Sequence, residues 1–368
     1  MLLVLSTAVF AGDIKFEFED ARFHSDYLFG LAPFYLRAGI DYTGLELIKD
    51  QKTDLYVIGG GALISSNLWT DQLGTPVLPS DLSDPENFAD WNSYSKWQGD
   101  FSLKLKQGLI QEEGREELKP LLAVYAKYGF HYTDPHENAA GSKSFFFQGS
   151  EAVYPDKNGT ISNIMQLGVE IDRMDHTDLY SGFNINASVI YAPEWFFNSF
   201  KGRTDFYSAN VTFEGYLPIA ELKWDDSDLT MFGLYLADRL IADYTNGSAI
   251  PQFYQESPAL GSKLRGFDGN SFGTNFTIAN NFDIRIYALE FLDNINPVLN
   301  IFFDAGYYAG NYYNTDYSKS GILCSAGAQI ALNVFDFAQL GYTFAWPLVG
   351  MPDGEIKMRS GLMLLYKF

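Results

Sequence analysis

An arginine in a turn-rich segment and an aspartate in a later strand pattern are the two groups whose chemistry guides the interpretation of this sequence. Their motifs are Leu264, Arg265, Gly266 and Phe267, and Phe302, Asp304 and Gly306. Side chains alternate along a strand, so Asp304 would point inward together with Phe302 and Gly306. A carboxylate inside a protein requires a partner, and a guanidinium can satisfy it through two hydrogen bonds. Because Gly266 permits a tight backbone that folds the loop back, we predict an internal ion pair between Arg265 and Asp304.

Other groups that could catalyse a reaction or bind a metal do not form a recognisable constellation. The four histidines are scattered at His24, His131, His136 and His176. The middle two are five positions apart at a strand end, which is not helical metal-ligand spacing. The segment GGGALIS at 59–65 lacks the Lys-Ser/Thr pair and the following helix of a phosphate-binding loop. The single cysteine, Cys324, shares its parity with apolar neighbours and is interpreted as a small apolar residue. We expect no enzyme activity, no metal and no cofactor.

Composition limits both the fold and the partners. Aromatic residues make up 17% of the 368 residues and charged residues only 19%. No run approaches the roughly 18 apolar residues that a membrane-spanning helix requires. The formal charge of −21 disfavours nucleic acid as a partner, because its phosphates would be repelled. Acidic runs at 81–90 and 224–228 are interpreted as solvated loops, since they lack the spacing of a calcium-binding loop.

The dominant sequence pattern has a period of two. Alternating apolar faces occur at 36–42, 101–105, 165–171, 183–191 and 338–346. The opposite faces carry small, polar or charged residues, which a packed soluble core would rarely tolerate; the charged ones include Lys104, Lys106, Glu170 and Asp172. Aromatic residues gather near strand ends, as in PEWFFNSF at 193–200, where membrane barrels have interfacial girdles. We therefore predict an all-β protein, a transmembrane antiparallel β-barrel.

The number of strands follows from counting these patterns. Thirteen are clear, eight before Arg265 and five after it, and weaker candidates lie at 14–18 and 145–147. Single-chain bacterial barrels have an even number of strands, so we predict about sixteen, with about fourteen as the alternative.

The two ends of the chain carry patterns typical of exported outer-membrane proteins. Residues 1–11 resemble the apolar part of a signal peptide without its basic n-region, as if the signal were truncated. Residues 12–32 would then form a short periplasmic segment, and residues 33–368 the barrel. One face of the last strand pattern, which resembles the C-terminal assembly signal of outer-membrane barrels, consists of Leu362, Leu364, Tyr366 and Phe368.

Taken together, these motifs resemble those of the Omp85 superfamily, which includes outer-membrane assembly barrels and two-partner secretion barrels. In that family an R-G-F/Y tip on a long extracellular loop enters the lumen and pairs with the aspartate of an F-x-D-x-G strand motif. Here the loop motif begins at Leu264, the strand motif begins at Phe302, and five strand patterns follow the loop as in the family. The resemblance is detailed over residues 261–368 and only architectural before them. Most members carry POTRA domains, but residues 12–32 are too few for an independent domain, so the chain resembles a barrel-only member.

This resemblance implies an outer-membrane protein that assists the insertion or translocation of other envelope proteins. The first and last strands would form a weakly paired seam, here between residues 33–43 and 356–368, where a client strand could add. The Arg265–Asp304 pair would hold the loop as a structural switch. Expected partners are outer-membrane lipid, client envelope proteins and periplasmic accessory proteins in place of POTRA domains, around a monomeric barrel. The alternatives are a passive porin-like channel for small solutes and a surface adhesin, which has no positive motif.

Overall fold

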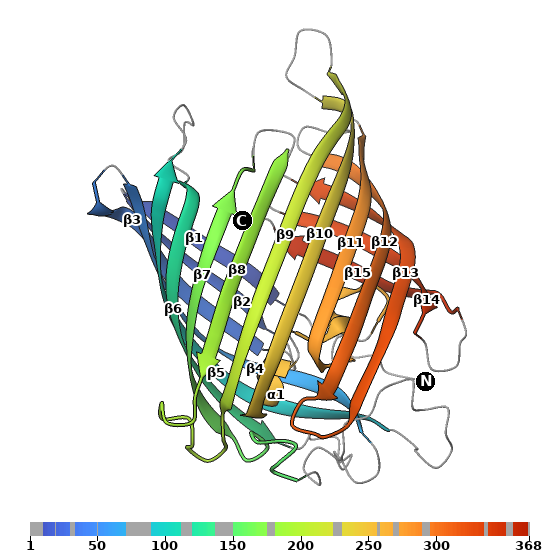
Figure 1. Cartoon of the computed structure of the whole chain (residues 1–368). Coiled ribbons are helices and arrows are strands. Elements are labelled where there is room, and N and C mark those ends of the chain that lie inside the picture. The colour runs from blue at the N-terminus through green and yellow to red at the C-terminus, as the bar shows by residue number, and fades with distance from the viewer. Residues whose placement is uncertain are drawn as a thin grey trace.

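A single antiparallel sheet makes up most of the computed structural model (Figure 1). The structure describes residues 10–18, 20–29, 34–49, 51–70, 90–111, 120–136, 150–174, 181–223, 230–255, 258–267, 272–288, 295–334, 338–350 and 356–366. In chain order, which is also the order in the sheet, the strands are β1 (Phe10–Phe18), β2 (Ala21–Phe29), β3 (Phe34–Ile48), β4 (Gln51–Thr70), β5 (Asp90–Gln111), β6 (Pro120–His136), β7 (Thr160–Asp172), β8 (Gly182–Ala192), β9 (Asp205–Lys223), β10 (Thr230–Ala249), β11 (Thr274–Ala288), β12 (Ile295–Tyr312), β13 (Ser318–Val334), β14 (Ala338–Val349) and β15 (Arg359–Tyr366). A short helix, α1 (Gln252–Gln255), and a 3-10 turn, η3 (Leu260–Lys263), lie between β10 and β11.

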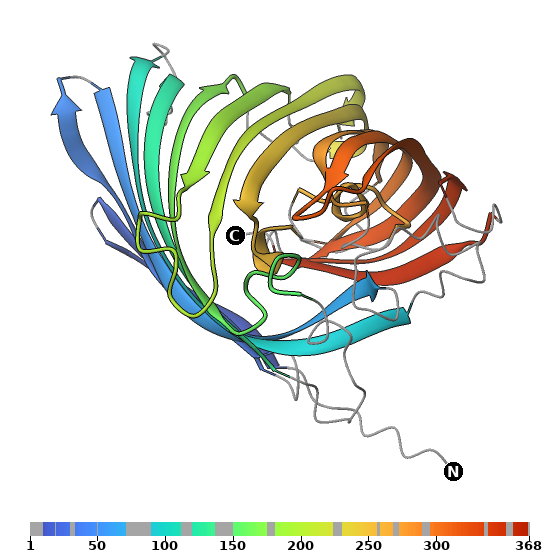
Figure 2. The same ribbon diagram turned by 60° about the horizontal axis from the view of Figure 1, so that its bottom comes forward.

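The sheet curls into a barrel wall (Figure 2). Strands β10 to β15 curve tightly around the segment that joins β10 to β11, whereas the preceding strands form a broader arc. Every described strand pairs antiparallel with its chain neighbours, and β1 and β15 remain as the two edges of the described sheet. The predicted fold class, an all-β antiparallel barrel, is confirmed. None of the helices in the described part of the chain is long and apolar enough to cross a membrane.

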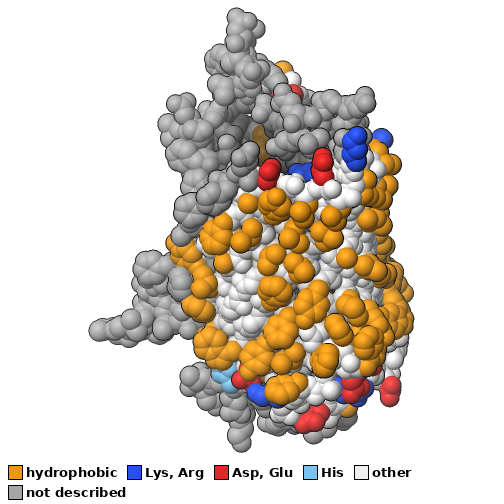
Figure 3. Space-filling model, turned by 90° about the vertical axis from the view of Figure 1, so that its left-hand side faces the viewer, with side chains coloured by type: hydrophobic (Ala, Val, Ile, Leu, Met, Phe, Trp, Pro, Cys, Tyr) orange, Lys and Arg blue, Asp and Glu red, His pale blue; other side chains and the backbone are white. Residues whose placement is uncertain are grey.

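Apolar side chains cover the outside of this wall, and polar side chains line the inside. Leu36, Leu103 and Val189, from three of the predicted apolar faces, are all exposed. On the inner face Lys106 contacts Glu170 at 2.7 Å, and each side chain is only 15% exposed. Figure 3 shows hydrophobic side chains spread over the middle of one outer face, with charged side chains gathered toward its two ends. A soluble sandwich has the opposite distribution, whereas a membrane barrel has this one.

Two strands at the beginning of the chain correct the predicted boundaries. β1 and β2 occupy residues 10–18 and 21–29, where a short periplasmic segment was expected at 12–32. β2 lies beside β3, with Ala21 opposite Tyr42 and Leu28 opposite Tyr35. The pattern of β2 is hard to recognise because its sequence, ARFHSDYLF, is short and carries three charged or titratable residues on one face. Residues 1–9 of the predicted signal peptide lie outside the described residues.

The strand count and the seam change accordingly. The eight predicted strands before Arg265 are β3 to β10 and the five after it are β11 to β15. With β1 and β2 the described part of the chain has fifteen strands, between the two predicted numbers of fourteen and sixteen. The candidate strand at 145–147 lies outside the described residues. Residues 33–43 are therefore not at an edge, because β3 pairs with β2 on one side and with β4 on the other.

Candidate functional site

The segment between β10 and β11 lies inside the curl of the sheet (Figure 2). Leu260 and Leu264 are 0% and 3% exposed, and they belong to one apolar cluster with Ala279, Tyr308 and Leu323 of the wall. Burying two leucines of a connecting segment against strand residues is favourable by roughly 1.5–3 kcal/mol for each side chain before the entropy cost of ordering. The segment is therefore a packed part of the barrel interior.

Arg265 contacts Asp304 of β12 through three hydrogen bonds. Its Nε donates to Oδ2 at 2.9 Å and its Nη2 donates to Oδ1 at 2.6 Å, which is the forked geometry of a bidentate pair. The backbone N–H of Arg265 also donates to Oδ2, at 2.9 Å. Asp304 is completely buried, so its charge depends on these donors. The next residue, Gly266, has a φ of +89°, a conformation that glycine adopts without strain and that turns the chain away from the contact.

A second carboxylate, that of Asp283, was not predicted from the sequence, and it balances the charge of the site. Nη2 of Arg265 donates to Oδ1 of Asp283 in β11 at 2.6 Å. Arg285 of the same strand donates to Oδ2 of Asp283 through Nη2 at 3.1 Å and Nε at 3.3 Å. Two guanidinium groups thus face two carboxylates, counting Asp304, and the sum is neutral, which lowers the cost of burying charge. The alternation of β11 gives Asp283 and Arg285 the same parity, a signal that could have placed both inside.

Phe302 and two glycines shape the space around the guanidinium. Cζ of Arg265 lies 3.8 Å from the centroid of the Phe302 ring, within cation–π distance. Gly327 of β13 lies opposite Phe302, and a Cβ there would come within 2.4 Å of the ring. A Cβ at Gly306 would lie 2.7 Å from Cδ1 of Leu260 in the inserted segment. One glycine thus leaves room for the aromatic ring and the other leaves room for the loop.

The other predicted site residues are placed as follows. Phe267 packs edge-to-face against Phe272, with ring centroids 6.2 Å apart, at the border of the same apolar cluster. Three residues of the C-terminal pattern lie on β15 opposite residues of β14: Leu362 opposite Tyr342, Leu364 opposite Leu340, and Tyr366 opposite Ala338. Phe368 lies outside the described residues. The role of these residues as an assembly signal stays a prediction.

The described histidines make separate contacts, and His176 lies outside the described residues. His131 stacks on Phe253 of α1 with centroids 4.6 Å apart, while His24 lies 3.9 Å from Asp41. Among the residues that the structure describes, no three metal-ligating side chains form a cluster. Cys324 is partly buried and lies between the exposed Ile322 and the partly buried Ala326 on the outward-facing parity.

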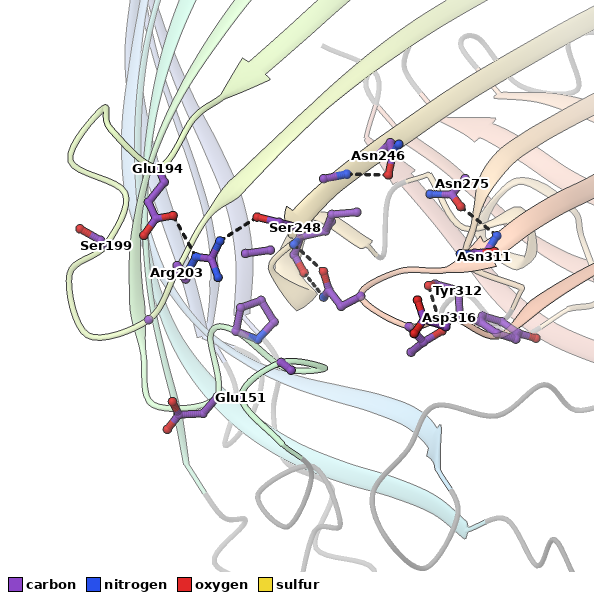
Figure 4. A pocket seen from close by; sticks show the side chains of 18 of the residues that line it. Glu151, Glu194, Ser199, Arg203, Asn246, Ser248, Asn275, Asn311, Tyr312 and Asp316 are labelled. Atoms are coloured by element: carbon purple, nitrogen blue, oxygen red, sulfur yellow. Dashed lines mark hydrogen bonds and ion pairs between the residues drawn. The ribbon is translucent and has the colours of Figure 1, made fainter.

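The inserted segment begins at one end of the barrel, and the strand connections at that end surround a polar pocket of about 850 Å³ (Figure 4). Arg203 joins two of its walls, since Nε donates to Oε2 of Glu194 at 3.0 Å and Nη2 donates to Oγ of Ser248 at 2.7 Å. Asn314 joins two others, because its Oδ1 accepts the N–H of Ile250 at 2.7 Å. These charged and amide groups hold the connecting segments to one another around the pocket.

Asp156 holds α1 to the connection between β6 and β7. Its Oδ2 accepts the N–H of Gln252, the first residue of α1, at 3.0 Å, and the residue is only 2% exposed. Burial raises the pKa of Asp156 to about 6, and the backbone hydrogen bond from Gln252 and the charge of Lys96 offset part of this effect. Asp156 lies outside the strands, in the connection between β6 and β7.

Lowering the pH from about 7 to about 5 should stabilise the folded arrangement in which Asp156 is buried against openings that expose it to water, because burial makes the ionised carboxylate the disfavoured form. The penalty is absent below the ordinary pKa of 3.8 and fully present above about 6. Amide hydrogen exchange of residues 252–255, corrected for its intrinsic pH dependence, should therefore slow as the pH falls. Asp156→Asn keeps a hydrogen-bond acceptor and should abolish the dependence. The same pH dependence in the variant and the wild type would contradict this assignment.

Solved structures of known proteins have a similar overall fold. BamA from Haemophilus ducreyi lacking POTRA domains 1–3 is similar with a TM-score of 0.52 and 13% identity, over 93% of this chain and 64% of that one. CdiB from Escherichia coli gives a TM-score of 0.56 and 10% identity, over 94% and 55%. The chain has the barrel fold of these BamA and CdiB structures. CdiB from Acinetobacter baumannii agrees, with a TM-score of 0.51 and 11% identity over 98% and 57% of the two chains.

The chain spans less than two thirds of the length of each of these three structures. No protein-family model matches its sequence, and no curated protein matches it significantly. At this level of identity the likeness establishes the fold. The inserted loop and its ion pairs are observations on this chain itself.

Proposed function

We propose that this protein is an outer-membrane barrel of the Omp85 type that assists other envelope proteins in inserting into or crossing that membrane. The observation that carries the proposal is a connecting loop held inside a barrel of this fold by the bidentate contact of Arg265 with the buried Asp304. This contact joins the loop to the barrel wall, so we assign it a role in positioning the loop. Periplasmic accessory proteins in place of POTRA domains, and a monomeric barrel, stay predictions.

The outer surface and the connections support a membrane location and an orientation. Exposed leucines, valines and isoleucines lie along the outer faces of the strands, as lipid contact requires. At one end of the barrel two connections are short: β3 and β4 are joined by residues 49–50, and β13 and β14 by residues 335–337. At the other end, which carries the inserted loop, two connections are longer, at residues 193–204 and 250–273. Outer-membrane barrels have short periplasmic turns and longer extracellular loops, so the inserted loop starts from the extracellular end.

The two edges of the sheet support a site for a client strand. Neighbouring strands alternate in direction, so β1 and β15, the first and last of fifteen, run the same way. One further strand placed between them could pair antiparallel with both, and unpaired edges are templates for strand addition. We therefore place the seam at β1 and β15, in place of the expected seam at residues 33–43.

A photo-crosslinking amino acid at Gly361 of β15 tests this function. In the outer membrane or in proteoliposomes supplied with an unfolded eight-stranded barrel, we expect crosslinks to the client at this edge. The matched control is the same amino acid at Val189, an outward-facing and exposed residue of the interior strand β8, which should give few crosslinks. Equal crosslinking at both positions would contradict an edge-specific site. A large and steady conductance in planar bilayers, without client crosslinks, would favour the passive channel.

A further inference from the structure

Lys263 makes a second buried contact between the inserted loop and the wall, two residues before Arg265. Its ammonium group pairs with Asp243 of β10, and the side chains are only 6% and 9% exposed. Nζ also donates to Oγ1 of Thr277 and to the carbonyl oxygen of Pro258, both at 2.7 Å. An ammonium has three protons, so these three acceptors satisfy it completely. This is a built site rather than a chance surface contact.

The surroundings of Lys263 fix both partners. Oδ1 of Asp243 accepts a hydrogen bond from the side-chain amide of Asn210 on β9. The amide of Asn281 on β11 donates to the carbonyl oxygen of Lys263 at 2.9 Å. The hydroxyl of Thr277 donates to the carbonyl oxygen of Pro258 at 2.9 Å. The backbone on both sides of Lys263 is therefore held, and the ammonium meets its carboxylate without reorganising the loop.

We propose that the loop is held by two independent anchors, so that breaking the Arg265 contact alone does not release it from the barrel. The first anchor is Arg265 with Asp304 and Asp283, and the second anchor is Lys263 with Asp243. Together they connect the loop to three adjacent strands, because Asp243, Asp283 and Asp304 belong to β10, β11 and β12. A loop tied at both points makes these three strands one rigid unit.

The two anchors share no side chain, which is the physical basis of their independence. Asp243 has Lys263 and Asn210 as partners, whereas Asp304 has only groups of Arg265 in the described part of the chain. Losing one cation leaves the other pair, and the packing of Leu260 and Leu264, in place. The inference rests on the proposed function in one respect: if the wall moves when a client strand adds at β1 and β15, that movement would be confined to strands other than β10 to β12.

Access to a cysteine at Ala259 measures whether the loop leaves the wall. The change from alanine to cysteine is small because it adds a single sulfur atom. Ala259 is 1% exposed, so the thiol is protected from the reagent while the loop is docked. In a Cys324→Ser background, folded protein in membranes is treated with a polyethylene-glycol maleimide. We expect Arg265→Met and Lys263→Met to raise the labelling rate less than about threefold each, and the double variant to raise it at least about tenfold. Full exposure from Arg265→Met alone, or no further increase in the double variant, would overturn the proposal.

A charge-matched pair of variants covers the case in which the double variant does not fold. Lys263→Met leaves Asp243 buried without its counter-charge, and adding Asp243→Asn removes that charge. If the second anchor exists, the combination labels more slowly and unfolds at a higher denaturant concentration than Lys263→Met alone. If the added Asp243→Asn change restores neither the labelling rate nor the unfolding midpoint, the second anchor is refuted. Client crosslinking at Gly361 is recorded separately, so a protein with two anchors and no client would refute the proposed function while leaving the anchors standing.

Discussion

Replacing Arg265 with methionine should lower the stability of the folded barrel by about 3–5 kcal/mol, the cost of removing one partner of a buried ion pair. Asp304, fully buried, would keep none of the side-chain donors that it has now. The cation–π contact with Phe302 would be lost as well. Urea unfolding of the purified barrel in detergent, followed by tryptophan fluorescence, should show a lower midpoint with an unchanged slope. Expression should persist, whereas client crosslinking at Gly361 should fall.

Arg239→Met is the matched control for this variant. Arg239 pairs with Glu214 at 2.8 Å, but the two side chains are 54% and 36% exposed. Exposed pairs of this kind contribute no more than about 1 kcal/mol, so the unfolding midpoint should barely change. Arg265→Lys should recover little of the loss, because an ammonium cannot reproduce the forked contact. An Arg265→Met barrel that unfolds like the wild type and keeps its client crosslinks would remove the ion pair from the proposal.

The sequence specifies the long strands well because two-residue alternation is a local property. Patterns such as Phe101, Leu103 and Leu105 need no knowledge of neighbours, and all thirteen strands counted from such patterns are present as β3 to β15. The same alternation placed Phe302 and Asp304 on the inner face, where both are buried. Short strands with titratable inner faces, such as β2, carry too few apolar residues for that signal.

Contacts that depend on register or on the path of a loop could not be read in this way. Asp283 reaches Arg265 because β11 and β12 are aligned with Asp283 opposite Phe302. A shift of one residue would turn it to the lipid face. The pairing of Lys263 with Asp243 depends on the turn that η3 makes before Leu264, which alternation does not encode. Local pattern thus predicts which face a residue occupies, and three-dimensional packing decides which partner it meets.

Gly327→Ala should destabilise the barrel by about 1–3 kcal/mol or more, because β13 has no room for a methyl group at this position. A Cβ there would lie 2.0 Å from the carbonyl oxygen of Phe344 and 2.4 Å from Cζ of Phe302. The first atom is backbone of the neighbouring strand and cannot rotate away, so the strands must separate or the ring must move. If the Phe302 ring moves, the guanidinium of Arg265 loses the face on which it lies.

Gly361→Ala separates this crowding from the general effect of replacing a strand glycine. In the part of the chain that the structure describes, no atom lies within 4 Å of a Cβ at Gly361, so the free energy of unfolding should change by less than about 0.5 kcal/mol. Phe302→Leu combined with Gly327→Ala should cost less than the sum of the two single changes, because the smaller side chain relieves one of the two collisions. The remaining loss measures the collision with the carbonyl of Phe344. Strict additivity would mean that the ring does not rest on Gly327, and that Arg265 is held by its carboxylates without the aromatic support.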